Sequence, residues 1–253
     1  MYTLILLVTI GWACSNSDLN IPDTNPDQNS KDTTDMASDS TLTKDTTSTM
    51  NDSSLTYLAL GDSYTIGESV NQSERWPVQL VTRLQADSVD IQSPKIIART
   101  GWTTDELQNG IDAAKIDQTY DFVSLLIGVN NQYRNYDIKQ YIKEFEELLK
   151  QSIAFADNDK TRVFVVSIPD YGVTPFGMNR DPEQIGKEID EYNAIAKDFA
   201  DQYGVQYFNI TEISRKAKED PELVAGDGLH PSGKMYSEWV DLIEPWVINA
   251  INQ

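Results

Sequence analysis

The stretch Phe122–Asn130, which reads FVSLLIGVN, decides the fold. Its first six residues form an almost wholly apolar run without alternation, which is typical of a strand buried on both faces of a parallel sheet. Further short apolar runs occur on both sides of it along the chain. With it they predict a five-stranded parallel sheet, the other strands being Tyr57–Leu60, Ile96–Ala98, Val163–Ile168 and Val205–Ile210.

The segments between these runs have the apolar spacing of amphipathic helices. The periodic residues are Ile142, Phe145, Leu149 and Ile153 in one segment, Ile189, Tyr192, Ala196, Phe199 and Tyr203 in a second, and Trp239, Ile243, Trp246, Val247 and Ala250 in a third. We interpret these stripes as core packing. Alternation of strand and helix predicts an α/β domain over residues 55–253, with helices on both sides of the sheet.

The first 54 residues differ from the rest in composition. Residues 1–13, MYTLILLVTIGWA, are nearly all apolar but fall short of the roughly 20 residues that a spanning helix needs. Cys14 follows directly, so residues 1–14 resemble a bacterial lipoprotein signal in which this cysteine is lipidated, with an ordinary secretory signal as the alternative. Residues 15–54 are rich in Ser, Thr and Asp, which predicts a disordered linker. We therefore expect an exported protein, either a cell-envelope lipoprotein on the periplasmic or outer surface or a secreted protein.

Composition excludes several kinds of site and partner. The chain has 40 acidic and 20 basic residues, a net charge of -20 that disfavours nucleic acid and leaves a lipid anchor as the expected contact with a membrane. Its single cysteine allows no internal disulfide, and its single histidine excludes a metal site built from several imidazoles. We expect no metal, no cofactor and a monomer.

Candidate chemical groups follow the ends of the predicted strands, where open parallel sheets bind their ligands. Ser63 comes after the first strand, in the triplet Gly61-Asp62-Ser63. A serine hydroxyl needs a base to become a nucleophile, and His230 is the only histidine available. Asp227 precedes it by three residues, close enough to orient its ring. We interpret Asp62 as a turn or helix-cap residue.

The negatively charged oxygen of a tetrahedral intermediate needs hydrogen-bond donors. The N–H groups of Ser63 and Gly101 and the side-chain amide of Asn130 are candidates, because each follows a predicted strand. Aromatic side chains on nearby loops either shape a substrate pocket or pack against the domain. These are Trp102, Tyr133 and Phe176.

Together these residues resemble the four sequence blocks of the GDSL, or SGNH, hydrolase family. Gly61-Asp62-Ser63 is similar to the first block, Gly101 to the second, Gly128-Val129-Asn130 to the third and Asp227-Gly228-Leu229-His230 to the fourth. Tyr64 departs from the family's namesake leucine. The resemblance covers residues 55–253 and implies a three-layer, flavodoxin-like fold, hydrolysis of esters or thioesters, no metal, and an oxyanion hole of Ser63, Gly101 and Asn130.

The sequence thus predicts a serine esterase that works through an acyl-enzyme. Short acyl esters, acetylated sugars and lysophospholipids present the same carbonyl to Ser63, so glycan, lipid and small-molecule esters stay open as substrates. Two alternatives also stay open. One is an acyltransferase that passes the acyl group to a sugar hydroxyl, and the other is a surface-binding lipoprotein without catalysis.

Overall fold

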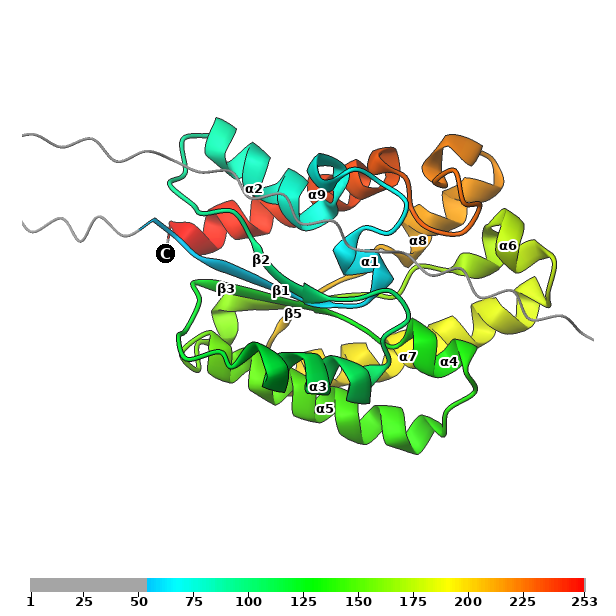
Figure 1. Ribbon diagram of the computed structural model, residues 1–253, viewed down its shortest axis with the longest axis horizontal. Coiled ribbons are helices and arrows are strands. Elements are labelled where there is room, and N and C mark those ends of the chain that lie inside the picture. The colour runs from blue at the N-terminus through cyan, green and yellow to red at the C-terminus, as the bar shows by residue number, and fades with distance from the viewer. Residues whose placement is uncertain (1–53, 253) are drawn as a thin grey trace, which may run out of the picture. The chain divides into compact units, whose positions relative to one another are not determined.

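A computed structural model describes residues 54–252. Its five strands lie parallel in the order β2-β1-β3-β4-β5, which confirms the predicted sheet and its flavodoxin-like topology (Figure 1). The strand order reverses between β1 and β3, so their carboxyl ends flank the position where such sheets bind ligands. The strands are β1 Tyr57–Gly61, β2 Lys95–Ala98, β3 Phe122–Leu126, β4 Val163–Val166 and β5 Gln206–Phe208.

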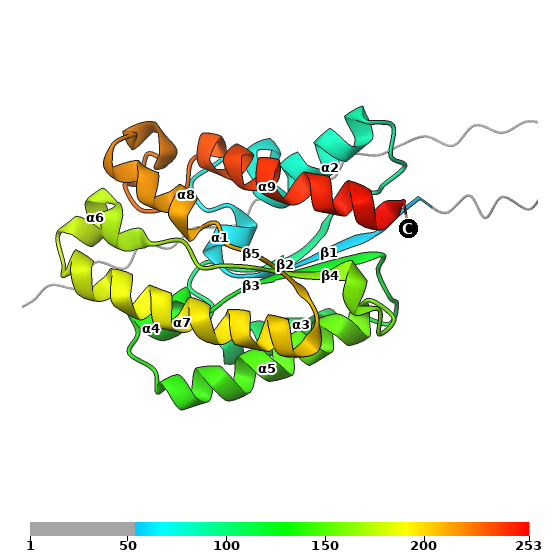
Figure 2. The ribbon, with the colours of Figure 1, turned by 180° about the vertical axis from the view of Figure 1, so that it is seen from behind.

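Helices cover both faces of the sheet and make the predicted three layers (Figures 1 and 2). One face carries α2 (Trp76–Ala86) and α9 (Gly233–Ile251), and the other carries α3 (Thr104–Ala114), α5 (Ile138–Phe155) and α7 (Pro182–Tyr203). Short helices lie beyond the carboxyl ends of the strands. Most of the 3-10 turns directly precede or follow one of these short helices in the sequence. The helices are α1 Ser63–Ile66, α4 Val129–Tyr133, α6 Pro175–Met178 and α8 Thr211–Arg215, and the turns are Gln72–Glu74, Lys160–Arg162, Tyr171–Val173, Lys216–Lys218 and Pro221–Leu223.

The core lies between the sheet and the two helical layers. All residues of β1, β3 and β4 are buried, as expected for strands covered on both faces. The stripe predicted on α5 was wrong at Ile142, which is 37% exposed. Tyr141 is buried in its place, because the face of α5 that packs inward runs through Tyr141, Phe145 and Leu148.

The fourth and fifth strands end earlier than the apolar runs predicted. Beyond β4, the Ile168 N–H donates to Asn193 Oδ1 at 2.7 Å instead of to a neighbouring strand. Beyond β5, the Ile210 N–H donates to Ser167 Oγ at 2.8 Å. Buried polar side chains therefore end the hydrogen-bond ladder at this edge of the sheet. Beyond it, the segments after β4 and β5 turn into the loops that surround the carboxyl ends of the strands.

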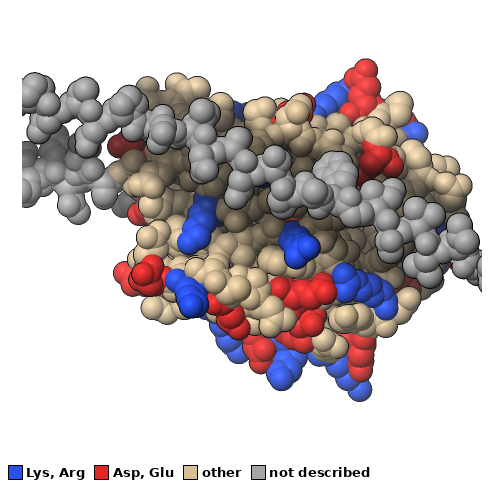
Figure 3. All heavy atoms as spheres, in the orientation of Figure 1, with Lys and Arg blue, Asp and Glu red and all other residues tan. Residues whose placement is uncertain are grey.

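Charges of both signs are mixed on the face that α3 and α5 present in Figure 3. Within α5, Lys150 lies 2.8 Å from Glu146 and Lys143 lies 4.0 Å from Glu147. Exposed pairs of this kind contribute little to stability, because water screens them. Their effect is to balance the acidic residues of this helix locally.

The predicted signal segment, residues 1–14 with Cys14, lies outside the described residues, as do residues 15–53 of the predicted linker. Within residues 54–252, no helix combines the length and the apolarity needed to cross a bilayer.

Candidate active site

Ser63 lies in a tight turn between β1 and the short helix α1. Gly61 ends the strand, and a Cβ added there would lie 2.3 Å from Thr65 Oγ1 and 2.5 Å from the Leu126 carbonyl oxygen. Only glycine therefore lets the chain turn this closely against β3. The turn places Ser63 at the first position of α1, where its N–H has no partner within the helix.

Asp62 caps α1, as predicted, by accepting a hydrogen bond of 3.0 Å from the Tyr64 N–H. Its side chain is fully buried, and its second oxygen, Oδ2, has no hydrogen-bond partner within residues 54–252. Burial raises the pKa of Asp62 to about 7, although the bond from Tyr64 acts in the opposite direction. The carboxyl group next to Ser63 is therefore partly protonated at neutral pH.

The loop after β2 and the helix after β3 are joined by a hydrogen bond of 2.9 Å from Asn130 Nδ2 to the Trp102 carbonyl. Gly101 has a φ of 88° and Gly128 a φ of 127°, in the region that favours glycine. Neither the Gly101 N–H nor the Ser63 N–H donates to another group among residues 54–252. Both N–H groups are therefore available to a ligand.

Asn131 and Arg134 hold the same loop from the other side. Asn131 is fully buried, accepts from the Thr104 N–H at 3.1 Å and donates to Thr104 Oγ1 at 2.7 Å. The Arg134 guanidinium donates to the Gly101 carbonyl at 2.5 Å. These bonds fix the backbone at Gly101 relative to α4.

His230 lies on the loop before α9 and is largely buried. Its Nδ1 lies 2.6 Å from Asp227 Oδ2, while Asp227 Oδ1 accepts from the N–H groups of Leu229 at 2.9 Å and His230 at 3.0 Å. Burial opposes a charge on Asp227, but these bonds and one from Ser69 outweigh it and lower its pKa below the usual range. The ionised carboxylate holds a proton on Nδ1 and leaves Nε2 as the acceptor.

One cavity of about 230 Å³ brings the predicted residues together. Ser63, Gly101, Asn130 and His230 line it, and Asp227 is hydrogen-bonded to His230 without lining it. Ser63 and His230 share the cavity without a hydrogen bond between their side chains in this structure, a looseness that is common in hydrolases without substrate. The rest of the wall is mostly apolar and includes Tyr64, Val129, Tyr133, Tyr171, Phe176 and Leu229.

Residues 59–237 match the model of the GDSL-like lipase/acylhydrolase family. The chain belongs to this family. It is accordingly a serine ester hydrolase, and the resemblance noted in the sequence is confirmed. A comparison with curated proteins gave no match.

Several solved structures, esterases among them, share the fold of this hydrolase. TesA superimposes with a TM-score of 0.61 at 16% identity, covering 77% of this chain and 99% of TesA. The esterase EstA from Pseudoalteromonas sp., inhibited by monoethylphosphonate, gives 0.58 at 20% identity, with 78% and 99% covered. Axe2, an acetylxylan esterase from Geobacillus stearothermophilus, gives 0.54 at 19% identity, with 79% and 95% covered. At these identities the likeness shows the fold.

Two of the three aromatic residues predicted near the site line the cavity of the hydrolase, namely Tyr133 and Phe176. Their rings lie 6.1 Å apart. The third, Trp102, does not line it. Its indole packs on α3, where a Cβ added to Gly110 would lie 2.2 Å from the indole ring. The sequence could not distinguish rings that line the cavity from rings that pack against the domain, because the direction of each ring depends on the conformation of its loop.

Tyr171 is a wall residue that sequence reasoning missed, because none of the residues after the fourth strand was assigned a role in the reaction. Its hydroxyl donates to Gln132 Oε1 at 3.0 Å, and its ring lies 6.3 Å from those of Tyr133 and Phe176. The available signal was position alone, since Tyr171 follows a predicted strand as Ser63 does. The hydrolase therefore builds an aromatic wall beyond β4.

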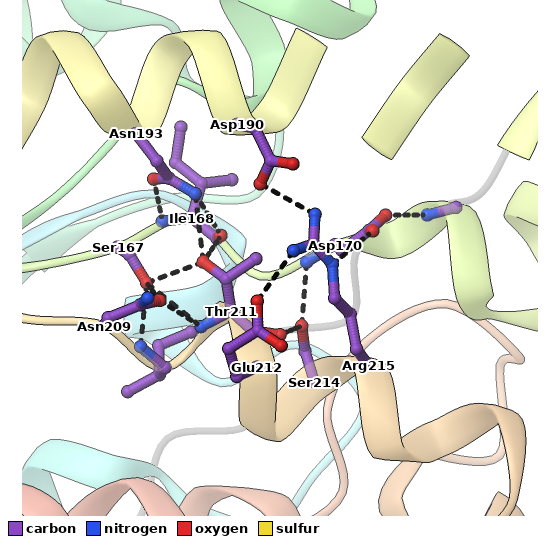
Figure 4. Close-up of polar contacts among 12 residues, drawn as sticks. Ser167, Ile168, Asp170, Asp190, Asn193, Asn209, Thr211, Glu212, Ser214 and Arg215 are labelled. Atoms are coloured by element: carbon purple, nitrogen blue, oxygen red, sulfur yellow. Dashed lines mark hydrogen bonds and ion pairs between the residues drawn. The ribbon is translucent and has the colours of Figure 1, made fainter. Parts of the chain in front are cut away.

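A partly buried network of polar side chains around Asp170 and Arg215 fixes the loop that carries Tyr171 (Figure 4). The Asp170 carboxylate accepts from the Gly172 N–H at 2.9 Å and from Arg215 Nε at 3.0 Å. The Asp170 N–H donates to Ser214 Oγ at 2.9 Å. Arg215 also reaches Asp190 at 2.7 Å. The loop that carries Tyr171 is thus attached to α7 and α8.

No group of three or more His, Cys, Asp or Glu side chains within residues 54–252 is arranged to hold a metal ion. Two acidic residues beside the cavity already have partners, since Asp62 caps α1 and Asp227 is bonded to His230.

Proposed function

We propose that this hydrolase cleaves carboxylic esters through an acyl-enzyme on Ser63, with His230 as base and Asp227 as the group that orients it. One observation carries the proposal. Ser63, Gly101, Asn130 and His230 line a single cavity, and His230 is bonded to an ionised Asp227. A nucleophile, a base and oxyanion donors are the parts that acyl transfer requires.

In the first half of the reaction, Ser63 Oγ attacks the ester carbonyl carbon while His230 Nε2 takes the hydroxyl proton. The carbonyl oxygen becomes negative and accepts bonds from the N–H groups of Ser63 and Gly101 and from Asn130 Nδ2. Collapse of this intermediate breaks the bond to the alcohol oxygen, which leaves with the proton from His230. Asp227 stabilises the imidazolium between these steps.

In the second half, a water molecule gives a proton to His230 and attacks the acyl carbon of the ester formed with Ser63. The same donors hold the second oxyanion. When it collapses, the carboxylic acid departs and Ser63 Oγ regains its proton from His230. A sugar hydroxyl in place of water would give the acyltransferase reaction on the same residues.

We infer that the acyl group is short. The cavity of about 230 Å³ holds about eight water-sized groups at about 30 Å³ each. Tyr133, Tyr171 and Phe176 make one side of it aromatic, which suits an apolar acyl chain better than a charged one. A small acyl group such as acetyl would also leave room for part of a sugar, and a lysophospholipid would have to leave most of its chain outside.

Labelling tests the nucleophile. A fluorophosphonate probe should attach to the full chain at Ser63 and be lost in Ser63→Ala, whereas Ser88→Ala, which changes an exposed serine in the turn after α2, should label normally. His230→Ala should fold and lose both labelling and turnover. Persistent labelling of folded Ser63→Ala, or turnover at the normal rate by His230→Ala, would refute the proposal.

A second experiment tests the acyl group and its acceptor. We expect kcat/KM for p-nitrophenyl esters to be highest between two and six carbons and to fall at eight and beyond. A preference for twelve carbons would contradict the short pocket. Analysis of the products with and without an acetylated or free sugar present separates hydrolysis from transfer.

We also propose that the hydrolase works outside the cytoplasm as a monomer attached to a membrane through Cys14. The support is the sequence of residues 1–14, an apolar run that ends in a cysteine. Metabolic labelling with an alkyne-bearing fatty acid should modify the full chain and not Cys14→Ala. Equal labelling of both would refute the attachment site.

A further inference from the structure

The segment of residues 67–70, between α1 and the 3-10 turn that follows it, contacts the catalytic carboxylate through Ser69. Ser69 Oγ donates a hydrogen bond of 2.7 Å to Asp227 Oδ2. This is the same oxygen that lies 2.6 Å from His230 Nδ1. Ser69 and Asp227 are separated by 158 residues in the sequence, so the tertiary fold creates this contact.

We propose that Ser69 is a positioning residue of this active site. It donates a second hydrogen bond to Asp227 Oδ2, fixes the carboxylate in the plane that His230 requires, and moderates the negative charge that the imidazole senses. The inference rests on the proposed function, because it assigns Ser69 to the reaction in which His230 acts as base.

Hydrogen bonds hold the backbone of this segment in an uncommon conformation. Gly67 has a φ of 70°, and Ser69, which is not a glycine, has a φ of 65°. A non-glycine residue in this region is uncommon and indicates that surrounding contacts impose the conformation. The N–H groups of Gly67 and Glu68 both donate to the Ser63 carbonyl at 3.0 Å. Ser69 is thereby tied to the helix that carries the nucleophile.

The segment also contacts the loop after β2. Glu68 accepts a hydrogen bond from Thr100 Oγ1, next to Gly101. The residues 67–70 therefore connect the nucleophile helix, the glycine loop and the acidic member of the His230 pair. A displacement of Ser69 would change the distances among Ser63, Gly101 and Asp227, which belong to different sequence blocks.

Removing the Ser69 hydroxyl changes the electrostatics of the pair in a defined direction. With one donor fewer, the Asp227 carboxylate keeps more of its charge for His230 and stabilises the imidazolium. The titration midpoint of His230 should therefore be higher in the variant than in the natural protein. The other titratable or charged side chains around the pair are the same in every variant. They are Tyr64 on α1, Tyr236 on α9, Asp170 and Tyr171 beyond β4 and, near Tyr236, Asp62, Glu68 and Arg75.

The experiment compares Ser69→Ala and Ser69→Gly with Ser88→Ala in the full chain. Ser88 is an exposed serine with a φ of 67° in the turn after α2, so it controls for a change of backbone strain without a contact to the site. His230 is the chain's only histidine, and its imidazole signals can be followed by NMR without ambiguity. Steady-state kinetics on p-nitrophenyl acetate supply kcat and KM.

We expect both Ser69 variants to raise the His230 midpoint and to lower kcat about fivefold to tenfold, with KM nearly unchanged. Ser88→Ala should match the natural protein in all three measurements. An unchanged midpoint and kcat in both Ser69 variants would overturn the proposal, and so would a shift in Ser69→Ala that Ser69→Gly abolishes, because that would assign the effect to the backbone. A natural protein that hydrolyses no ester would instead refute the proposed function, and the NMR titration would still test the contact.

Discussion

The buried carboxyl of Asp62 gives a prediction about stability and pH. Its side chain is fully buried and its Oδ2 has no partner within residues 54–252. Burial raises its pKa from 3.8 to about 7. We expect the substitution Asp62→Asn to remove this titration while preserving the cap, because an Asn side-chain oxygen also accepts from the Tyr64 N–H.

The sign follows from proton binding. Between pH 3.8 and about 7, the unfolded chain has released the Asp62 proton and the folded chain still holds it. The folded state binds more protons in this window, so the contribution of Asp62 to stability is full below pH 3.8 and is lost as the pH rises toward 7. From pH 4.5 to pH 8 the loss is about 3 kcal/mol, at 1.36 kcal/mol for each unit of pKa. Asp227, whose pKa is lowered, is the same in the natural protein and in Asp62→Asn, so its contribution cancels from their difference.

Urea unfolding at pH 4.5, 6 and 8 measures the effect. The free energy of unfolding of the natural protein, minus that of Asp62→Asn, should fall by about 3 kcal/mol from the lowest pH to the highest. Asp137→Asn is the matched control, since Asp137 caps α5 with the same bond, from the Lys139 N–H at 3.0 Å, but is exposed to water. A difference that stays constant within about 1 kcal/mol for Asp62→Asn would refute the argument from burial.

Further predictions concern neighbouring residues with different tasks. Asn130→Ala should lower kcat on p-nitrophenyl acetate about a hundredfold to a thousandfold, whereas Asn131→Ala should lower the free energy of unfolding in urea by about 1 to 3 kcal/mol; the opposite pattern would exchange their assignments. Arg215→Met should remove the hydrogen bond to Asp170, raise KM for hexanoate esters several-fold and leave kcat on acetate esters unchanged. A KM for hexanoate equal to that of the natural protein would show that the aromatic wall does not depend on this network. Gly61→Ala should yield no folded protein by circular dichroism, because its Cβ has no room.

The sheet and the meeting of the site residues were predictable from sequence for one physical reason. Carboxyl ends of parallel strands lie at one edge, so residues that directly follow separate strands must come close. Ser63, Gly101 and Asn130 each follow a strand within two to four residues, and the structure places all three in one cavity with His230. Short connections leave little freedom, and this is why the order of the blocks carried so much information.

The parts that sequence could not predict depend on longer connections and on side-chain direction. Trp102 follows Gly101 directly, yet its ring turns toward α3 because Gly110 leaves space for it. Tyr171 enters the cavity because its neighbour Asp170 is fixed by hydrogen bonds to Ser214 and Arg215. Both partners lie more than 40 residues away from Asp170 in the sequence. No local pattern encodes such contacts.

Ser69 shows why the four blocks do not by themselves make a working site. The blocks supply Ser63, Gly101 and Asp227, but each lies on a different connection of the sheet, and relative placement has to come from other residues. The segment 67–70 bonds to all three regions, through the Ser63 carbonyl, through Thr100 beside Gly101 and through Asp227 itself. Because a displacement of about 1 Å can cost a hundredfold in rate, substitutions in this segment should reduce turnover more than they reduce stability.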